Sequence, residues 1–122
     1  MALTVFLRIL FVFQLLLAAA VDGADNARVA GSYVFGHEVR SFQPCGSSKL
    51  YWAKAGDPEL AAVLRRHHGK LGAQPYDPIY VVVSGRISGD KTAGFAQSYD
   101  GYFEISEVFE AAGRIPTDCI IH

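Results

Sequence analysis

The chain has 122 residues, of which 51% are hydrophobic and 19% charged, and its formal net charge is −1 at pH 7. A chain of this length holds one small domain, and the near-neutral charge excludes a strongly basic nucleic-acid binder and an acidic disordered chain. Basic residues cluster only at Arg65, Arg66 and Lys70, which we interpret as the solvated face of a helix.

Residues 1–20 have the pattern of a secretory signal peptide. Arg8 precedes an apolar run of about 12 residues, shorter than the roughly 20 that cross a bilayer. Ala18 and Ala20 form a small-x-small pattern, so we expect cleavage after Ala20 and a periplasmic or secreted product without stable membrane insertion. Retention as an anchor is the alternative, because Arg8 lies deep for a signal peptide. Since no cysteine lies near the cut, we do not expect a lipoprotein.

Residues 21–30 are small and polar and predict a flexible lead-in, followed by one domain over residues 31–122. Alternating aromatic residues predict a strand at Tyr33–Gly36, and two more are expected at about Val39–Phe42 and Lys49–Ala53. Between the first two, Gly36-His37-Glu38 predicts a bulge or tight bend, since glycine accepts unusual backbone angles.

A single helix is predicted next, with Asp57 as N-cap and Pro58 at the first helical position. Apolar spacing places one face of this helix against the core, and Gly69 or Gly72 can end it. The core-facing residues are expected to be Leu60, Val63, Leu64, His67 and Leu71.

Ile79–Ile87 is the strongest strand signal, with Ile79, Val81 and Val83 on one face. Gly85 within it suggests a bulge. A loop at Ser88–Ser98, a last strand at Tyr102–Val108 and an irregular tail from Glu110 complete the order strand, strand, strand, helix, strand, strand. That order predicts a mainly β protein with an OB-fold-like, five-stranded Greek-key barrel.

Cys45 and Cys119 are the only cysteines. In an oxidising compartment two cysteines of a small domain usually pair, so we expect one structural disulfide that holds the C-terminal tail to the loop after the second strand. A redox or metal pair would want C-x-x-C spacing, which is absent, although that pair and free thiols remain alternatives.

The histidines lack the spacing of a zinc site, and no nucleophile elbow is present, so we expect no catalytic residue, metal or cofactor. His67 and His68 are expected at an exposed helix end. The alternatives are a small secreted hydrolase or metal-dependent enzyme that uses His37 and Glu38, and a metal-sequestering protein in which His122 approaches His37 or Cys45.

The domain is dense in aromatic residues, most of which must be core. In the third strand Tyr51 and Trp52 point to opposite faces, so one of them should face outward and contribute to a binding surface. Tryptophan and tyrosine often anchor interfaces, so we expect contact with a protein or a glycan. The slightly acidic charge and the export signal argue against nucleic acid as the partner.

The stretch from Gly31 to Lys54 resembles the start of the C-terminal OB domain of NlpE, a bacterial envelope lipoprotein linked to copper tolerance and envelope-stress signalling. The pattern is Gly31-x-Tyr33-x-Phe35, Phe42-x-x-Cys45 and Lys49-x-Tyr51, followed by a helix with Pro58-Glu59-Leu60, the strand Ile79–Gly85 and a late cysteine.

The resemblance implies an OB fold, a disulfide between this domain's two cysteines, and a non-enzymatic binding or sensing role in the envelope with a protein partner. The family's lipid-attachment cysteine and its N-terminal C-x-x-C domain have no counterpart in this sequence. The resemblance therefore implies a stand-alone exported module, without direct copper binding or a lipid anchor.

Overall fold

The computed structural model describes residues 27–72, 74–89 and 94–122. Its strands are β1 (Arg28–Gly36), β2 (Val39–Pro44), β3 (Tyr51–Ala55), β4 (Ile79–Ser88) and β5 (Tyr102–Ala112), and its helices are α2 (Pro58–Leu71) and the short η2 (Gly94–Ser98). The expected signal peptide, its cleavage site and residues 21–26 of the lead-in lie outside the described residues.

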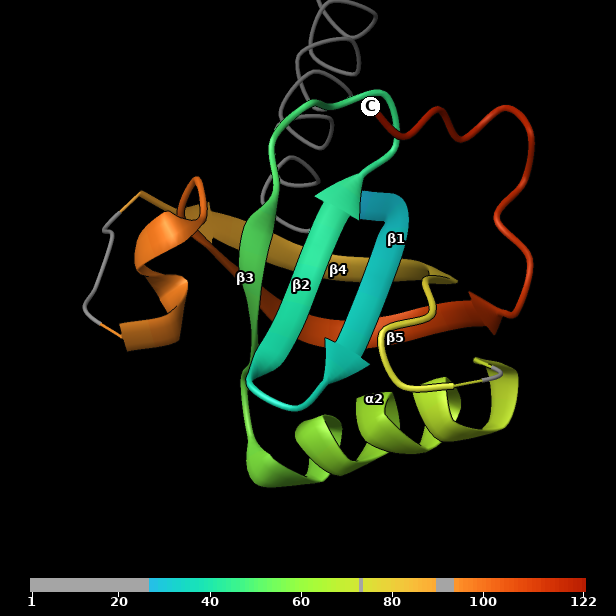
Figure 1. Ribbon diagram of the computed structural model, residues 1–122, viewed down its shortest axis with the longest axis horizontal. Helices are drawn as coiled ribbons and strands as arrows, with labels where there is room; N and C mark the ends of the chain where they lie inside the picture. The colour runs from blue at the N-terminus through green and yellow to red at the C-terminus, as the bar shows by residue number, and fades with distance from the viewer. Residues whose placement is uncertain (1–26, 73, 90–93) are drawn as a thin grey trace, which may run out of the picture.

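The five strands form a closed barrel in the order β1-β2-β3-β5-β4, in which β3 and β5 run parallel and the other pairs antiparallel (Figure 1). Helix α2 follows β3 and lies across one end of the barrel (Figure 1). These features confirm the predicted OB-type barrel with its β-β-β-α-β-β order.

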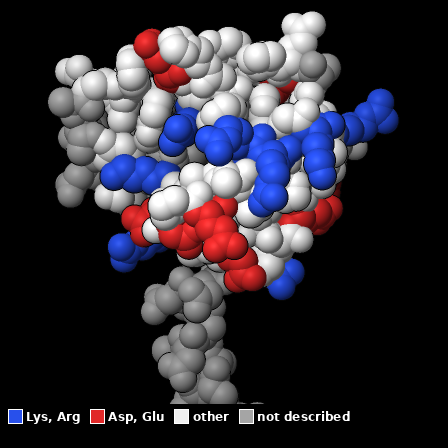
Figure 2. All heavy atoms as spheres, turned by 90° about the horizontal axis from the view of Figure 1, so that it is seen from below, with Lys and Arg blue, Asp and Glu red and all other residues white. Residues whose placement is uncertain are grey.

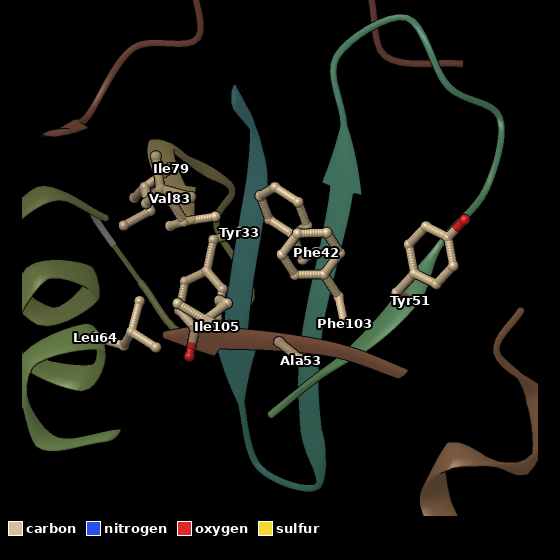
Figure 3. Close-up of a cluster of buried hydrophobic side chains, with 10 residues drawn as sticks. Tyr33, Phe42, Tyr51, Ala53, Leu64, Ile79, Val83, Phe103 and Ile105 are labelled. Atoms are coloured by element: carbon tan, nitrogen blue, oxygen red, sulfur yellow. The ribbon is translucent and has the colours of Figure 1, made fainter. Parts of the chain in front are cut away.

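The barrel interior is filled by large apolar side chains from every strand (Figure 3). Phe42 and Phe103 pack with their ring centroids 4.6 Å apart, and Leu64 of α2 closes one end. The predicted alternation in β4 is confirmed, because Ile79, Val81 and Val83 are all fully buried.

Strand boundaries differ from the prediction where pairing partners extend them. β1 begins at Arg28, inside the expected lead-in, because Arg28 pairs with Ser84 of β4. β5 continues to Ala112, inside the expected tail, because Ala112 pairs with Tyr80. β3 begins only at Tyr51, since the preceding Leu50 N–H is bound by the Asp100 carboxylate.

The predicted bulge at Gly85 is confirmed by a register shift between Ser84 and Gly85. A Cβ at this position would overlap the Glu104 carbonyl oxygen and the Phe103 ring. The β1–β2 bend also lies where expected, but the positive φ of 61° falls on Glu38 rather than on Gly36. Gly36 is required for another reason, because the Tyr76 ring occupies the space of its Cβ.

Helix α2 begins as predicted, with the Asp57 carboxylate accepting from the Leu60 N–H at 2.7 Å, and it ends before Gly72. The prediction of an exposed His68 is wrong, since this residue is 4% exposed. Its position four residues after Leu64 places it on the same inward face. The connector after the helix also folds over it, and the His68 Nε2–H donates to the Asp77 carbonyl at 2.7 Å.

Candidate functional site

The surface that carries the predicted binding residues is the outer side of β3 next to the β4–β5 loop. Tyr51 is 8% exposed and belongs to the barrel core, so it is not available to a partner. Trp52, its neighbour in the strand, points outward and is half-buried. Trp52 is therefore the residue of the predicted pair that can contribute to a binding surface.

Two aromatic residues of the β4–β5 loop gather on Trp52. The Phe95 ring stacks on the indole at 21° with centroids 6.4 Å apart, and the Tyr99 ring meets it edge-on with centroids 5.4 Å apart. Phe95 is 58% exposed. We call Trp52, Phe95 and Tyr99 the aromatic cluster.

Hydrogen bonds fix the loop end against β3. Leu50 and Asp100 exchange two bonds, since the Leu50 N–H reaches the Asp100 carboxylate at 2.8 Å and the Asp100 N–H reaches the Leu50 carbonyl at 2.9 Å. The Trp52 N–H then donates to the Gly101 carbonyl at 2.9 Å. Tyr99 is thereby held beside Trp52, and the cluster is a preformed surface.

A shallow groove of about 490 Å³ leads from Trp52 past Lys54 to Arg40 and the beginning of α2. The Lys54 ammonium lies 3.9 Å from the centroid of the Tyr102 ring, a cation–π contact that holds it on the surface of the strand. The surface beside the aromatic cluster therefore combines the positive charges of Arg40 and Lys54 with aromatic rings.

The chain's two cysteines join two segments: Cys45 opens the β2–β3 loop, and Cys119 lies in the C-terminal tail. Cys45 and Cys119 form a disulfide across 74 residues of sequence, with Cα atoms 4.7 Å apart. The Gly46 N–H donates to the Ile120 carbonyl at 2.7 Å, and the Gln43 side chain donates to the His122 carbonyl at 3.0 Å. The C-terminal tail thus lies along the β2–β3 loop (Figure 1).

His37 and Glu38, the residues of the alternative enzyme prediction, occupy the β1–β2 turn. The His37 Nε2 and a Glu38 carboxylate oxygen are 3.4 Å apart, and the two side chains are 86% and 52% exposed. Among residues 27–72, 74–89 and 94–122, no group of three or more His, Cys, Asp or Glu side chains could hold a metal ion. In the same part of the chain, no helix combines the length and apolarity needed to cross a membrane.

Comparison with known protein families agrees with the barrel. Residues 24–98 match the family model described as the NlpE C-terminal OB domain. The chain belongs to this family. No curated protein and no solved structure matches the chain.

The NlpE C-terminal OB domain match includes Cys45, Trp52 and Phe95, whereas β5 and Cys119 lie beyond it. OB folds bind ligands on the face of strands 2 and 3 and with the loops that follow strands 1 and 4. The aromatic cluster occupies that region, since Trp52 lies on β3 and its two partners lie in the β4–β5 loop. Sequence reasoning found Trp52 but missed Phe95 and Tyr99, because only the folded barrel brings them together.

Proposed function

We propose that the chain is an exported, non-enzymatic binding module of the bacterial envelope that contacts a protein partner through the aromatic cluster. The observation that carries the proposal is the exposed Phe95–Trp52 stack on the ligand-binding face of an OB barrel. Contiguous exposed apolar surface often marks an interaction site, and tryptophan and tyrosine are frequent anchors of protein interfaces.

The disulfide supports the export of this module. Disulfides persist in oxidising compartments such as the periplasm and are rare in the cytosol. The Cys45–Cys119 bridge, together with the signal-like residues 1–20, therefore favours a periplasmic or secreted protein. Membership of the NlpE C-terminal family favours an envelope-stress context for its partner.

A binding role also fits the surroundings of His37 and Glu38 better than a hydrolytic one. A catalytic acid or base must lie within hydrogen-bond reach of a bound substrate and is usually held there by neighbouring groups. The His37 and Glu38 side chains are 86% and 52% exposed at the tip of a turn, on the rim of the pocket between the β1–β2 hairpin and α2, and no described residue holds them in place by a hydrogen bond to their side chains. We therefore assign them no catalytic role.

The experiment is affinity capture from envelope extract with the tagged, oxidised domain. A Trp52→Ala variant is compared with Phe109→Ala, because Phe109 is also an exposed aromatic residue but lies toward the other end of β5. We expect the wild type and Phe109→Ala to capture the same protein in similar amounts. Trp52→Ala should capture about tenfold less of it, as for loss of an interface hot spot. Equal capture by both variants, or no specific capture, would count against the proposal.

A further inference from the structure

A second concave site lies away from the aromatic cluster, at the end of the barrel covered by α2. A pocket of about 650 Å³ opens between the tip of the β1–β2 hairpin, the C-terminal half of α2 and the connector at residues 74–75. Its lining includes Phe35 and Arg40 from the hairpin strands, and Arg65 and His68 from the helix. A pocket of this size can hold a small organic molecule.

The walls of this pocket are fixed to one another. The Tyr76 N–H donates to the Phe35 carbonyl at 3.0 Å, and its hydroxyl donates to the His37 carbonyl at 3.1 Å. Its ring lies against Gly36, where any Cβ would collide with it. The bond from His68 Nε2 to the Asp77 carbonyl holds the connector to the helix. Hairpin, helix and connector therefore form one preorganised cavity.

Two guanidinium groups from different elements line the pocket. Arg40 of β2 lies with its Cζ 5.6 Å from the centroid of the Phe35 ring, and Arg65 comes from α2. Neither arginine forms an ion pair with a carboxylate of the described residues. Both also line a small void beside Tyr33. Figure 2 looks at the face that carries α2 and shows Lys and Arg side chains gathered in a band across it.

Both arginines act electrostatically on the same buried group. Burial raises the pKa of the Tyr33 hydroxyl to about 12, while the positive charges of Arg40 and Arg65 oppose that rise. The two guanidinium groups therefore create a positive potential at one place between β2 and α2. Both arginines are exposed to solvent, so an anion from solution can reach either guanidinium group.

Two carboxylates lie near the pocket, and of these only Glu38 is part of its lining. Glu38 lies on its rim with its carboxylate 3.4 Å from the His37 ring, and the Asp77 carboxylate accepts from the Gln74 N–H at 2.8 Å. The His68 ring uses Nε2 on the Asp77 carbonyl. The arginine donors in the lining are those of Arg40 and Arg65, whose planar guanidinium groups suit a planar or tetrahedral oxyanion.

From these contacts we infer that the pocket binds a small organic anion, a carboxylate or a phosphate carried on a flat apolar body. The anionic group lies between Arg40 and Arg65, and the apolar body lies against the Phe35 ring and the backbone of the helix end. This pocket contains no residue of the aromatic cluster, although Arg40 also lines the groove that begins at Trp52, and the inference does not depend on a protein binding at the cluster.

The test is isothermal titration of the oxidised domain with phenyl phosphate and with benzoate, which distinguish a phosphate ligand from a carboxylate ligand. Benzyl alcohol supplies the ring without the charge. We expect at least one of the two anions to bind with a Kd below about 1 mM, and benzyl alcohol to bind at least tenfold more weakly. Amide NMR shifts should map the bound anion to Gly36, Gly69 and Gly72, all of which line the pocket.

Arginine variants distinguish specific binding in the pocket from general attraction of anions to a positive surface. Arg40→Gln and Arg65→Gln should each weaken binding about tenfold or more, as expected when a charge-assisted hydrogen bond is lost. Arg66→Gln, the matched control on the same helix outside the pocket lining, should change the Kd less than twofold. If Arg40→Gln does not fold, Arg40→Lys takes its place. It keeps the positive charge, but it should still weaken binding severalfold because the planar guanidinium fork is lost.

The inference is overturned if neither anion binds with a Kd below about 1 mM, or if Arg66→Gln weakens binding as much as the pocket variants do. It is also overturned if the amide shifts map to the aromatic cluster instead. Anion binding that depends on Arg40 and Arg65, with shifts at the three glycines, supports it.

Discussion

The indole ring of Trp52 and the phenyl ring of Phe95 lie almost parallel, 21° apart in their planes and 6.4 Å between centroids. The two residues come from β3 and from η2 in the β4–β5 loop, and Phe95 remains more than half exposed. A loop held in this way presents a flat apolar surface whose rings are ordered before any partner arrives. Preordered rings lower the entropy cost of binding.

This stack can be followed by fluorescence, because Trp52 is the only tryptophan in the chain. We expect Phe95→Ala to shift Trp52 emission to longer wavelength and to increase its quenching by acrylamide, since the ring that covers the indole is gone. The free energy of unfolding should fall by about 1 kcal/mol or less, as for a partly exposed aromatic pair. Phe109→Ala is the control and should leave the emission unchanged; an unchanged spectrum in Phe95→Ala would mean that the rings do not stack in solution.

The disulfide should account for a large part of the stability. The chain-entropy model assigns about 4 kcal/mol to a bridge that closes a loop of this length. Replacing both cysteines by serine should lower the free energy of unfolding by about that amount in urea titrations, and should release the tail that Gly46 and Gln43 bind. In mass spectrometry the oxidised protein should be lighter by two hydrogens than the reduced one. Alkylation of both thiols without reductant would contradict the bridge.

Tyr33 should make stability fall at high pH. Burial raises the pKa of Tyr33 to about 12, whereas an unfolded tyrosine titrates near 10. Above pH 10 the unfolded chain loses this proton while the folded chain keeps it, so the free energy of unfolding decreases as pH rises toward 12, by up to about 3 kcal/mol. Ultraviolet titration should show a late-titrating tyrosine that is absent in Tyr33→Phe. A Tyr33→Phe variant with the same alkaline loss of stability would refute the assignment.

Gly85 should tolerate no side chain. A Cβ there would meet the Glu104 carbonyl and the Phe103 ring, so Gly85→Ala must displace β5 from the bulge. We expect a loss of about 2 kcal/mol in the free energy of unfolding, as for overpacking of a core. Gly89→Ala is the matched control, because a Cβ at that position would meet nothing within 4 Å, and it should be nearly neutral. Equal stability of the two variants would show that the bulge relaxes without cost.

Local sequence patterns predicted helices and strands well where their structure depends on residues close together in the sequence. The cap at Asp57 and the alternation of Ile79, Val81 and Val83 depend on neighbours in sequence, and both appear in the fold. The ends of β1 and β5 were harder to predict. These strands reach Arg28 and Ala112 because they pair with β4, which is distant in sequence. His68 was misjudged for a different reason: its spacing of four residues from Leu64 marks the inward face, and the connector that covers it through the Asp77 carbonyl follows the helix.

The candidate sites were only partly predictable. The outward position of Trp52 follows from strand alternation, but its contact with Phe95 spans more than forty residues and needs the closed barrel. Arg40 and Arg65 belong to a strand and a helix that show no shared motif. Their meeting in one pocket depends on how α2 lies across the barrel end.

The central claim is that a protein partner binds at the aromatic cluster, and site-specific photocrosslinking in the native host tests it most directly. A photoreactive phenylalanine analogue replaces Phe95 in one strain and the exposed Phe109 in another. The proposal predicts a discrete crosslinked protein adduct from position 95 and none from position 109. No adduct at position 95, or the same adducts from both positions, would contradict it.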